Sequence, residues 1–221
     1  EVTQSVVVNK IAPTFSVSCS PNLVAYGANT TCTAVVSGGA TGNVSFYDNG
    51  VLWTSSTVSG GAASAMGFAG HAPGSYSVTA SYSGDTYNNS ASAGTTVTVT
   101  QAPQSITFTP PLSPVTYGVA PISLSASASS GLGGTFNVLS GPATISGNIL
   151  TITGAGTVFV AANQPGNVDY SAAPQVTQSI TVNKATPTLT WATPATITYG
   201  TPLSGTQLNA TSGGVAGNFS D

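Results

Sequence analysis

Residues able to act as acid, base or nucleophile are few in this sequence and lie far apart. His71 is the single histidine, inside the turn-like stretch GHAPG, and the acids are scattered along the chain. A catalytic triad or a zinc site needs several such groups together. We therefore expect no catalytic residue, no metal site and no cofactor, and we interpret His71 as an exposed turn residue. The acids are Glu1, Asp48, Asp85, Asp169 and Asp221.

Three of the acids fall in turns. Asp48 begins an Asp-Asn-Gly hairpin signal, and Asp85 and Asp169 lie in loops at equivalent places, beside Tyr87 and Tyr170. Aspartate in such a loop usually accepts hydrogen bonds from nearby backbone N–H groups in an Asx turn. A calcium ion needs about six to eight oxygen ligands, and no linker here contains more than one acid. We therefore predict structural roles for these acids.

The two cysteines predict a disulfide. Cys19 and Cys32 are separated by the turn-rich stretch SPNLVAYGANTT. They flank one Tyr-Gly corner, so we expect them on neighbouring strands, within the roughly 4.4–6.8 Å between Cα atoms that a disulfide needs. Closing this loop contributes roughly 3 kcal/mol and indicates an oxidising compartment. The alternative is two buried free thiols.

Composition argues against ionic partners. Charged residues make up 3% of the chain, which has two Lys, no Arg and a net charge of −3. Because binding to nucleic acid or anionic lipid requires a basic surface, we expect neither partner. No apolar run reaches the length of a membrane span, and we expect no membrane insertion and no signal peptide in this segment. Alternating Val, Ile, Phe and Tyr predict a folded, mostly β chain.

A strand that occurs twice sets the organisation of the chain. VTQSVVVNK covers residues 2–10 and VTQSITVNK covers residues 176–184, identical at seven of nine positions. Alternating apolar residues followed by Asn-Lys predict a strand and then a linker. Tyr26, Tyr117 and Tyr199, each followed by Gly, mark the same corner in three successive units. The predicted domains are 1–11 (the last strand of a preceding domain plus a linker), 12–102, 103–185 and 186–221 (the first part of a further domain).

Short alternating runs between turn signals predict antiparallel sandwiches in the two complete domains. Asn49-Gly50 and Gly147-Asn148 are two-residue hairpin turns. The Tyr-Gly corner, the run GNVSFYDNG and the late loop SGDTYNNSAS resemble bacterial immunoglobulin-like repeat domains. The resemblance implies an all-β fold of tandem immunoglobulin-like sandwiches in a large secreted or cell-surface protein. The second domain carries PGNVDYSAAP in place of that loop and has no cysteine pair.

This architecture is typical of three kinds of protein. We expect a non-enzymatic structural protein, an extracellular fibre, stalk or filament of head-to-tail domains. The alternatives are an adhesin whose loops bind a glycan or protein, and a non-catalytic spacer of an enzyme. Trp53 and Trp191 are candidates for a sugar-stacking platform, although their alternating positions favour packing inside the sandwiches.

The ends of the chain suggest assembly. An amphipathic strand with free edges is suited to β-augmentation, and the candidate assembly residues are Val2, Gln4, Val6 and Val8. We expect a homo-oligomer of head-to-tail copies, with strand donation as one route and continuation into a longer polypeptide as the other. The environment of Val6, Val8, Trp191 and Phe219 in the assembled form is the test.

Lys10 and Lys184 end equivalent strands, so they mark linker boundaries, although a Lys–Asn isopeptide crosslink is an alternative. Because trypsin has only these two residues to recognise and both lie at domain boundaries, we predict resistance to it.

Overall fold

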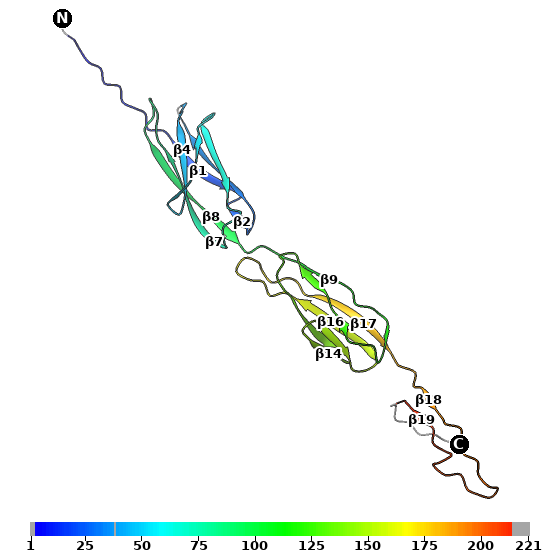
Figure 1. Ribbon diagram of the computed structural model, residues 1–221. Helices are drawn as coiled ribbons and strands as arrows, with labels where there is room; N and C mark the ends of the chain where they lie inside the picture. Colours follow the sequence, from blue (N-terminus) through cyan, green and yellow to red (C-terminus); the bar gives the residue numbers. More distant parts are fainter. Residues whose placement is uncertain (1–2, 38, 214–221) are drawn as a thin grey trace. The chain divides into compact units, whose positions relative to one another are not determined.

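The computed structural model describes residues 3–37 and 39–213, and every regular element in that part of the chain is a β-strand. The described residues therefore include no helix that is long and apolar enough to span a bilayer. The chain divides into two compact units, each described by itself below (Figure 1). Unit 1 comprises the described residues of Glu1–Thr107, Ala126–Gly134 and Asn163–Val176, and unit 2 comprises those of Phe108–Ser125, Thr135–Ala162 and Thr177–Asp221.

Unit 1 contains a complete sandwich, here called the first sandwich. Its sheets have the orders β1-β3-β6 and β2-β8-β7-β4-β5, with antiparallel pairs except for parallel β2–β8. Short strands that alternate between buried and exposed residues produce this two-layer fold. The strands are β1 (Phe15–Ser20), β2 (Leu23–Ala25), β3 (Thr30–Val36), β4 (Asn43–Asp48), β5 (Val51–Thr57), β6 (Ala62–Gly67), β7 (Gly74–Tyr82) and β8 (Ala91–Thr100).

The hairpin between β4 and β5 turns at the predicted dipeptide. Asn49 has a φ of 46° and Gly50 a φ of 85°. Positive φ at both central positions is what a type I′ turn requires, and it matches the twist of the flanking strands. The predicted hairpin at this site is confirmed.

The core of the first sandwich consists of the inward-facing residues of both sheets. Val44, Phe46 and Val78 are fully buried, and Trp53 packs against them from β5. Trp53 also meets Phe68 edge to face, with ring centroids 5.3 Å apart. Its predicted packing role is therefore confirmed.

Cys19 and Cys32 form a disulfide inside one sheet. They are directly opposed on β1 and β3, and their Cα atoms are 3.9 Å apart. This distance is shorter than the range of roughly 4.4–6.8 Å expected from the sequence, and the two cysteines lie on neighbouring strands as expected. Both cysteines are buried, so the bond joins the first two long strands within the core.

The second sandwich has sheets of the orders β10-β17-β16-β13 and β11-β15-β14, and β9 pairs with β12 in a further two-stranded sheet. β14 and β15 pair up to Ser146 and Ile149, which confirms the predicted turn at Gly147-Asn148. The strands are β9 (Ile106–Phe108), β10 (Val115–Thr116), β11 (Ile122–Ser123), β12 (Ala126–Ala128), β13 (Thr135–Ser140), β14 (Ala143–Ser146), β15 (Ile149–Ile152), β16 (Gly156–Asn163) and β17 (Val176–Asn183).

The boundary between the compact units does not follow the predicted domain limit near residue 102. Residues 126–134 and 163–176 belong to the second predicted domain but group with the first sandwich in unit 1. The domain limits from the sequence therefore stay a prediction. Beyond β17, β18 (Leu189–Thr190) pairs with β19 (Thr211–Ser212), and the further domain from residue 186 likewise stays a prediction.

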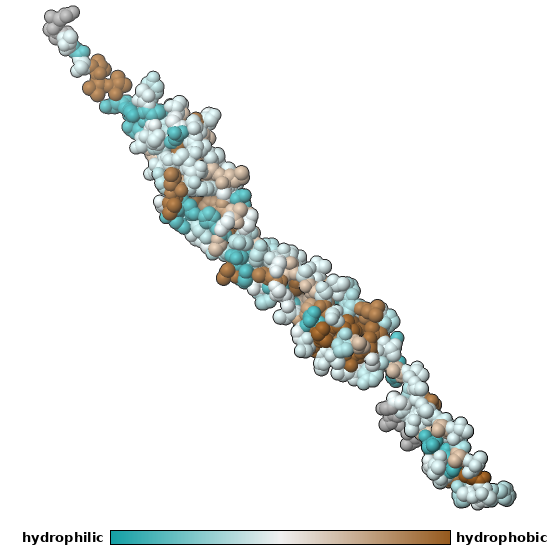
Figure 2. All heavy atoms as spheres, in the orientation of Figure 1, coloured by the Kyte–Doolittle hydropathy of each residue, from teal (hydrophilic) through white to brown (hydrophobic). Residues whose placement is uncertain are grey.

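The repeated strand adopts its predicted form in only one of its two copies. Residues 176–183 form β17, which pairs with β10 and β16, and Ile180 and Val182 are buried. Residues 3–10 are not in a strand, contrary to the prediction, because nothing in the described part of the chain pairs with them there. Apolar atoms of this segment are visible on the surface in Figure 2. A strand needs a neighbour to hydrogen-bond, so the same sequence behaves differently in the two places.

Candidate functional site

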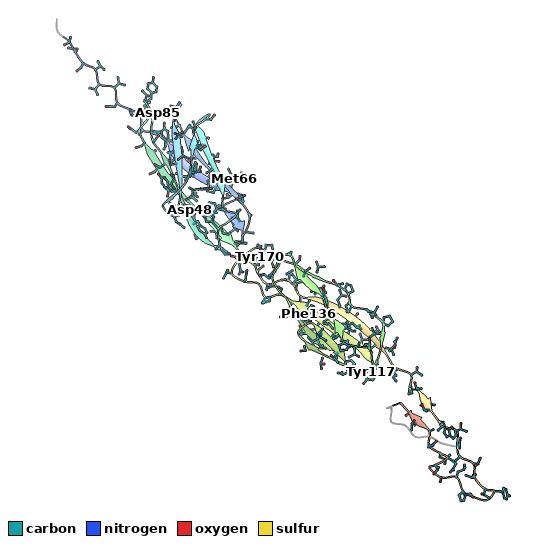
Figure 3. All side chains as sticks on the ribbon, viewed as in Figure 1. Asp48, Met66, Asp85, Tyr117, Phe136 and Tyr170 are labelled. Carbon is teal, nitrogen blue, oxygen red and sulfur yellow. A yellow bond between two sulfur atoms is a disulfide. The ribbon has the colours of Figure 1, made fainter. Side chains whose placement is uncertain are left out.

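The predicted Asx turn at Asp85 organises the loop between β7 and β8. Asp85 Oδ1 accepts hydrogen bonds from the backbone N–H groups of Tyr87 at 2.8 Å and Asn88 at 2.7 Å. Its Oδ2 accepts from the N–H of Thr41 at 2.8 Å and from the Thr41 hydroxyl at 3.2 Å. One carboxylate thus shapes its own loop and ties it to the β3–β4 loop. Asp85 is labelled in Figure 3.

This loop holds the segment that enters the first sandwich. The Ile11 N–H donates to the carbonyl of Tyr87 at 2.8 Å, and the Asn89 N–H donates to the carbonyl of Ile11 at 2.8 Å. Ile11 and Asn88 thereby form an isolated parallel bridge. Lys10 Nζ adds a bond to the backbone carbonyl of Asp85 at 2.6 Å. We call this arrangement, Lys10 and Ile11 held by residues 83–90, the first linker clasp.

The electrostatics of the first clasp follow from these bonds. The N–H of Thr41, followed by those of Tyr87 and Asn88, stabilises the ionised carboxylate and lowers the pKa of Asp85 well below its usual range. Tyr82 is fully buried beneath the loop, and burial raises the pKa of its phenol. Its hydroxyl donates to the carbonyl of Thr41 at 2.8 Å. In the first clasp, the ionised carboxylate of Asp85, which accepts hydrogen bonds, thus lies above the neutral, buried phenol of Tyr82, which donates one.

A second clasp repeats the backbone bonds further along unit 1. The Ala102 N–H donates to the carbonyl of Asp169 at 2.8 Å, and the Ser171 N–H donates to the carbonyl of Ala102 at 3.0 Å. Ala102 and Tyr170 form the parallel bridge. Gln101 Nε2 donates to the carbonyl of Asn167 at 2.7 Å, in the place of the bond from Lys10 to Asp85. We call Gln101 and Ala102, held by residues 165–171, the second linker clasp.

Asn167 does in the second clasp what Asp85 does in the first. Its Oδ1 accepts from the N–H of Asp169 at 2.9 Å and from that of Tyr170 at 2.8 Å. The Asx turn predicted for Asp169, in the loop equivalent to that of Asp85, is formed instead by Asn167. Asp169 corresponds to Tyr87 and contributes its backbone carbonyl, because the two loops align from their Gly-Asx pairs without an insertion.

A buried amide pair replaces the tyrosine beneath the second loop. Gln164 Nε2 donates to the carbonyl of Gly133 at 3.4 Å, as Tyr82 donates to Thr41. Gln164 Oε1 accepts from Gln104 Nε2 and from the Gly166 N–H, each at 2.5 Å. Both glutamines are buried, and Ser130 donates its hydroxyl hydrogen to Gln104 Oε1. Buried amides need such partners to offset their desolvation.

A glycine at positive φ starts both loops. Gly84 has a φ of 82° and Gly166 a φ of 80°. A Cβ at Gly166 would lie 2.3 Å from the carbonyl oxygen of Tyr170, and one at Gly84 would lie 2.9 Å from that of Asn88. Side chains are thus excluded from both positions by conformation and by space.

His71 lies in a setting that the sequence did not predict. Its Nε2 is 2.6 Å from Asp48 Oδ2, and its ring packs on Phe68, with centroids 4.4 Å apart, and on Tyr76. It is a half-buried brace between the β4–β5 hairpin and the turn before β7, and not a freely exposed turn residue. The only side-chain hydrogen bond of His71 among the described residues is to Asp48, and no group of three metal-ligating side chains occurs among them. The pairing was missed because 23 residues separate the two partners.

Of the predicted assembly residues, Gln4, Val6 and Val8 lie on the exposed segment before β1. Val6 and Val8 are 87% and 89% exposed, and Gln4 is also exposed. Val2 and Phe219 lie outside the described residues. Trp191 is 61% exposed and donates its Nε1–H to the carbonyl of Gln207. Strand donation therefore stays a prediction.

The sheets, the hairpins and the two clasps define an immunoglobulin-like β-sandwich protein. Residues 17–100, which cover most of the first sandwich, match the model of the bacterial Ig-like domain (group 3), so the resemblance seen in the sequence is confirmed. No curated protein matches the chain.

Solved structures with similar architecture were also found. The fibronectin(III)-like modules of Clostridium thermocellum CbhA align at 18% identity with a TM-score of 0.31, covering 76% of this chain and 94% of that one. The titin domains z1z2 in complex with telethonin align at 19% identity with a TM-score of 0.43, covering 81% of this chain and 100% of that one. A 1.5-MDa bacterial ice-binding adhesin aligns at 16% identity with a TM-score of 0.35, covering 82% of this chain and 69% of that one. At these levels we draw no functional argument from any of the three.

Proposed function

We propose that this chain is a non-enzymatic structural segment of an extracellular or cell-surface protein, in which immunoglobulin-like domains follow head to tail as a fibre, stalk or filament. The observation that carries the proposal is the repetition of the linker clasp. In both cases the linker residue exchanges two backbone hydrogen bonds with a Gly-Asx loop of the domain it enters. Backbone bonds on both sides of a linker residue restrain its φ and ψ, which a freely hinged linker would lack.

The composition and the disulfide support the setting. A disulfide persists in oxidising compartments, which fits a secreted or surface location. Few charges leave a surface of Ser, Thr and Asn, and a protein with low net charge associates more readily than a highly charged one. Both properties suit a subunit of an extracellular array.

Domain tumbling tests the proposal. We expect ¹⁵N relaxation to give the two sandwiches a common rotational correlation time, because the second clasp restrains the linker between them. The variant Gly166→Ala should separate the two correlation times and shorten both. Gly118→Ala is the matched control, since Gly118 also has a positive φ, of 92°, but a Cβ there meets nothing within 4 Å. Independent tumbling in the unmodified chain would contradict the proposal, and specific binding on a glycan array would favour an adhesin.

Assembly by strand donation is a separable part of the proposal. Val6 and Val8 correspond to Ile180 and Val182, which are buried in β17, whereas Val7 corresponds to the exposed Thr181. If residues 2–10 pair with a neighbouring copy, Val6→Asn with Val8→Asn should abolish self-association in sedimentation velocity, and Val7→Thr should leave it unchanged. A monomer in all three forms at high concentration would remove strand donation and leave the tandem array.

A further inference from the structure

A third linker has the sequence of a clasped linker. Lys184 and Ala185 follow β17 just as Gln101 and Ala102 follow β8, and Lys10 and Ile11 end the first copy of the same strand sequence. Each pair begins with a side chain that donates hydrogen bonds, either Lys or Gln. In the first two linkers this donor reaches the carbonyl of the loop's Asx residue. Within the described residues, Ala185 has neither of the two backbone bonds that Ile11 and Ala102 make.

The surface beside this third linker is hollow. Tyr117, Gly118, Ala155 and residues 184–188 line a depression of about 520 Å³ within unit 2. Tyr117 belongs to the Tyr-Gly corner, is labelled in Figure 3 and is 46% exposed. Its counterpart in the first sandwich, Tyr26, meets Tyr170 edge to face within unit 1, with centroids 5.6 Å apart. The corner tyrosine beside the second clasp is thus covered by the docked loop, and the one beside the third linker is not.

We infer that Tyr117 and residues 184–186 form a docking site for the Gly-Asx loop of a further immunoglobulin-like domain. This inference rests on the proposed function and names the partner of the next position in the array. The chemistry of the occupant is set by the second clasp: a Gly at positive φ, then Asn or Asp, with a Tyr at the position of Tyr170. The Asx residue shapes the loop, and the Tyr ring covers Tyr117.

Three contacts are specified by this docking. The Ala185 N–H donates to the loop carbonyl that corresponds to Asp169, and the Ala185 carbonyl accepts the N–H that corresponds to Ser171. Lys184 Nζ donates to the carbonyl of the Asx residue, as Lys10 does at 2.6 Å in the first clasp. The loop needs no charge of its own, because Asn167 performs the same task as Asp85.

A fusion that supplies the loop tests the inference. Residues 1–186 are joined directly to a second copy of residues 104–185, so that Ala185 stands two positions before Gln104, as Ala102 does, and precedes a sandwich with its own Gly-Asx loop. We expect the amide of Ala185 to exchange at least about tenfold more slowly than in the original chain, since a bonded amide must open before it exchanges. Trypsin cleavage after Lys184 of the linker should slow in parallel.

The matched control places Gly166→Ala in the appended copy alone. That change should restore fast exchange at Ala185 while leaving Ala102 protected in the same molecule. Tyr117→Ala provides a second variant and should weaken protection of Ala185 without unfolding β17, whose amides serve as the internal reference. Unchanged exchange at Ala185 in the fusion, with Ala102 protected, would overturn this inference but not the proposed function. Loss of protection at both Ala185 and Ala102 would overturn both this inference and the proposed function.

A domain added as a separate chain distinguishes the source of the loop. Residues 103–185 are mixed in excess with the original chain, and exchange at Ala185 is measured again. Protection in the fusion alone supports docking by a domain of the same polypeptide, and protection in both experiments supports docking between chains as well. Absence of protection in both contradicts the inference.

Discussion

The first and second linker clasps have the same backbone hydrogen bonds but differ in the side chains that support them. In the first, the charged Asp85 lies above the buried phenol of Tyr82, and Lys10 closes the clasp. In the second, Asn167 replaces the aspartate and the Gln164–Gln104 pair replaces the phenol. The four backbone groups that bond each other nevertheless belong to equivalent residues in the two clasps. Conserved geometry here does not depend on one set of side chains.

What both clasps require is a glycine and an Asx residue in succession. Glycine supplies the positive φ, and the Asx oxygen accepts two successive N–H groups at 2.7–2.9 Å. The buried donor beneath the loop must only reach the carbonyl of Thr41 or of Gly133, which a phenol or an amide can do. The comparison therefore separates the residues that shape the loop from those that fill the space below it.

The largest expected difference between the two sandwiches comes from the disulfide, which only the first possesses. Removing it with Cys19→Ala and Cys32→Ala should lower the free energy of unfolding of the first sandwich by about 3 kcal/mol, from the regained freedom of the unfolded chain. Trp53 fluorescence during urea unfolding, in a Trp191→Phe background, measures this. Amide exchange of β17 should not change, and an equal loss there would show that the sandwiches unfold as one.

Glycine substitutions should open each clasp separately. Gly166→Ala should destabilise the second clasp by about 2–3 kcal/mol, because it combines positive φ with a contact against a backbone oxygen. Gly84→Ala should have a smaller effect on the first clasp, since its nearest contact is longer. Exchange of the Ala102 and Ile11 amides reports the two openings, and Gly118→Ala gives the cost of positive φ alone. Simultaneous opening of both clasps by one substitution would refute their independence.

The buried donors should differ in what their loss costs. Gln164→Leu removes the acceptor of the Gly166 N–H and one of the two acceptors of Gln104 Nε2, which keeps its bond to the carbonyl of Ser171, so we expect a loss of about 2 kcal/mol. Tyr82→Phe removes one hydrogen bond and retains the ring, for a loss of about 1 kcal/mol. Chemical unfolding of each sandwich, followed by NMR, compares the two. A larger loss of stability for Tyr82→Phe than for Gln164→Leu would mean that the Tyr82 hydroxyl contributes more stability than the amide network.

Lowering the pH should produce the smallest of the expected differences between the two clasps. The pKa of Asp85 is lower in the folded protein than the value of about 3.9 expected when unfolded, so its stabilisation is complete above that pH. It is lost as the pH falls toward the folded pKa, because the unfolded chain then binds more protons. The Ile11 amide should therefore exchange faster relative to Ala102 below about pH 4. Asp85→Asn should abolish this pH dependence, and its persistence would assign the effect to another acid.

Much of the fold follows from local pattern. The turns at Asn49-Gly50 and Gly147-Asn148 and the disulfide were predictable because they depend on residues close in sequence. Repetition also indicated equivalent loops after β7 and β16. These are the features for which nearby side chains and turn chemistry decide the structure.

The clasps and the brace were harder to foresee, because they join residues distant in sequence. Nothing near Ile11 indicates that its partners are Tyr87 and Asn89, and His71 meets Asp48 only after the sandwich has formed. The Asx turn predicted for Asp169 is formed by Asn167, because the loop is aligned by its Gly-Asx pair. Residues 3–10 show the same limit, since their sequence is that of β17 and the sheet neighbour decides whether a strand forms.

The position of the disulfide within one sheet has a mechanical consequence. A chain pulled from its ends can lengthen only by the residues that the crosslink leaves outside its loop. Cys19 and Cys32 are 13 positions apart, which withholds about 45 Å of contour length from the first domain at roughly 3.3–3.6 Å per residue. Under tension the first domain would therefore lengthen by a step about 45 Å shorter while the disulfide is intact than after its reduction, whereas the step of the second domain, which has no cysteine, would not change on reduction.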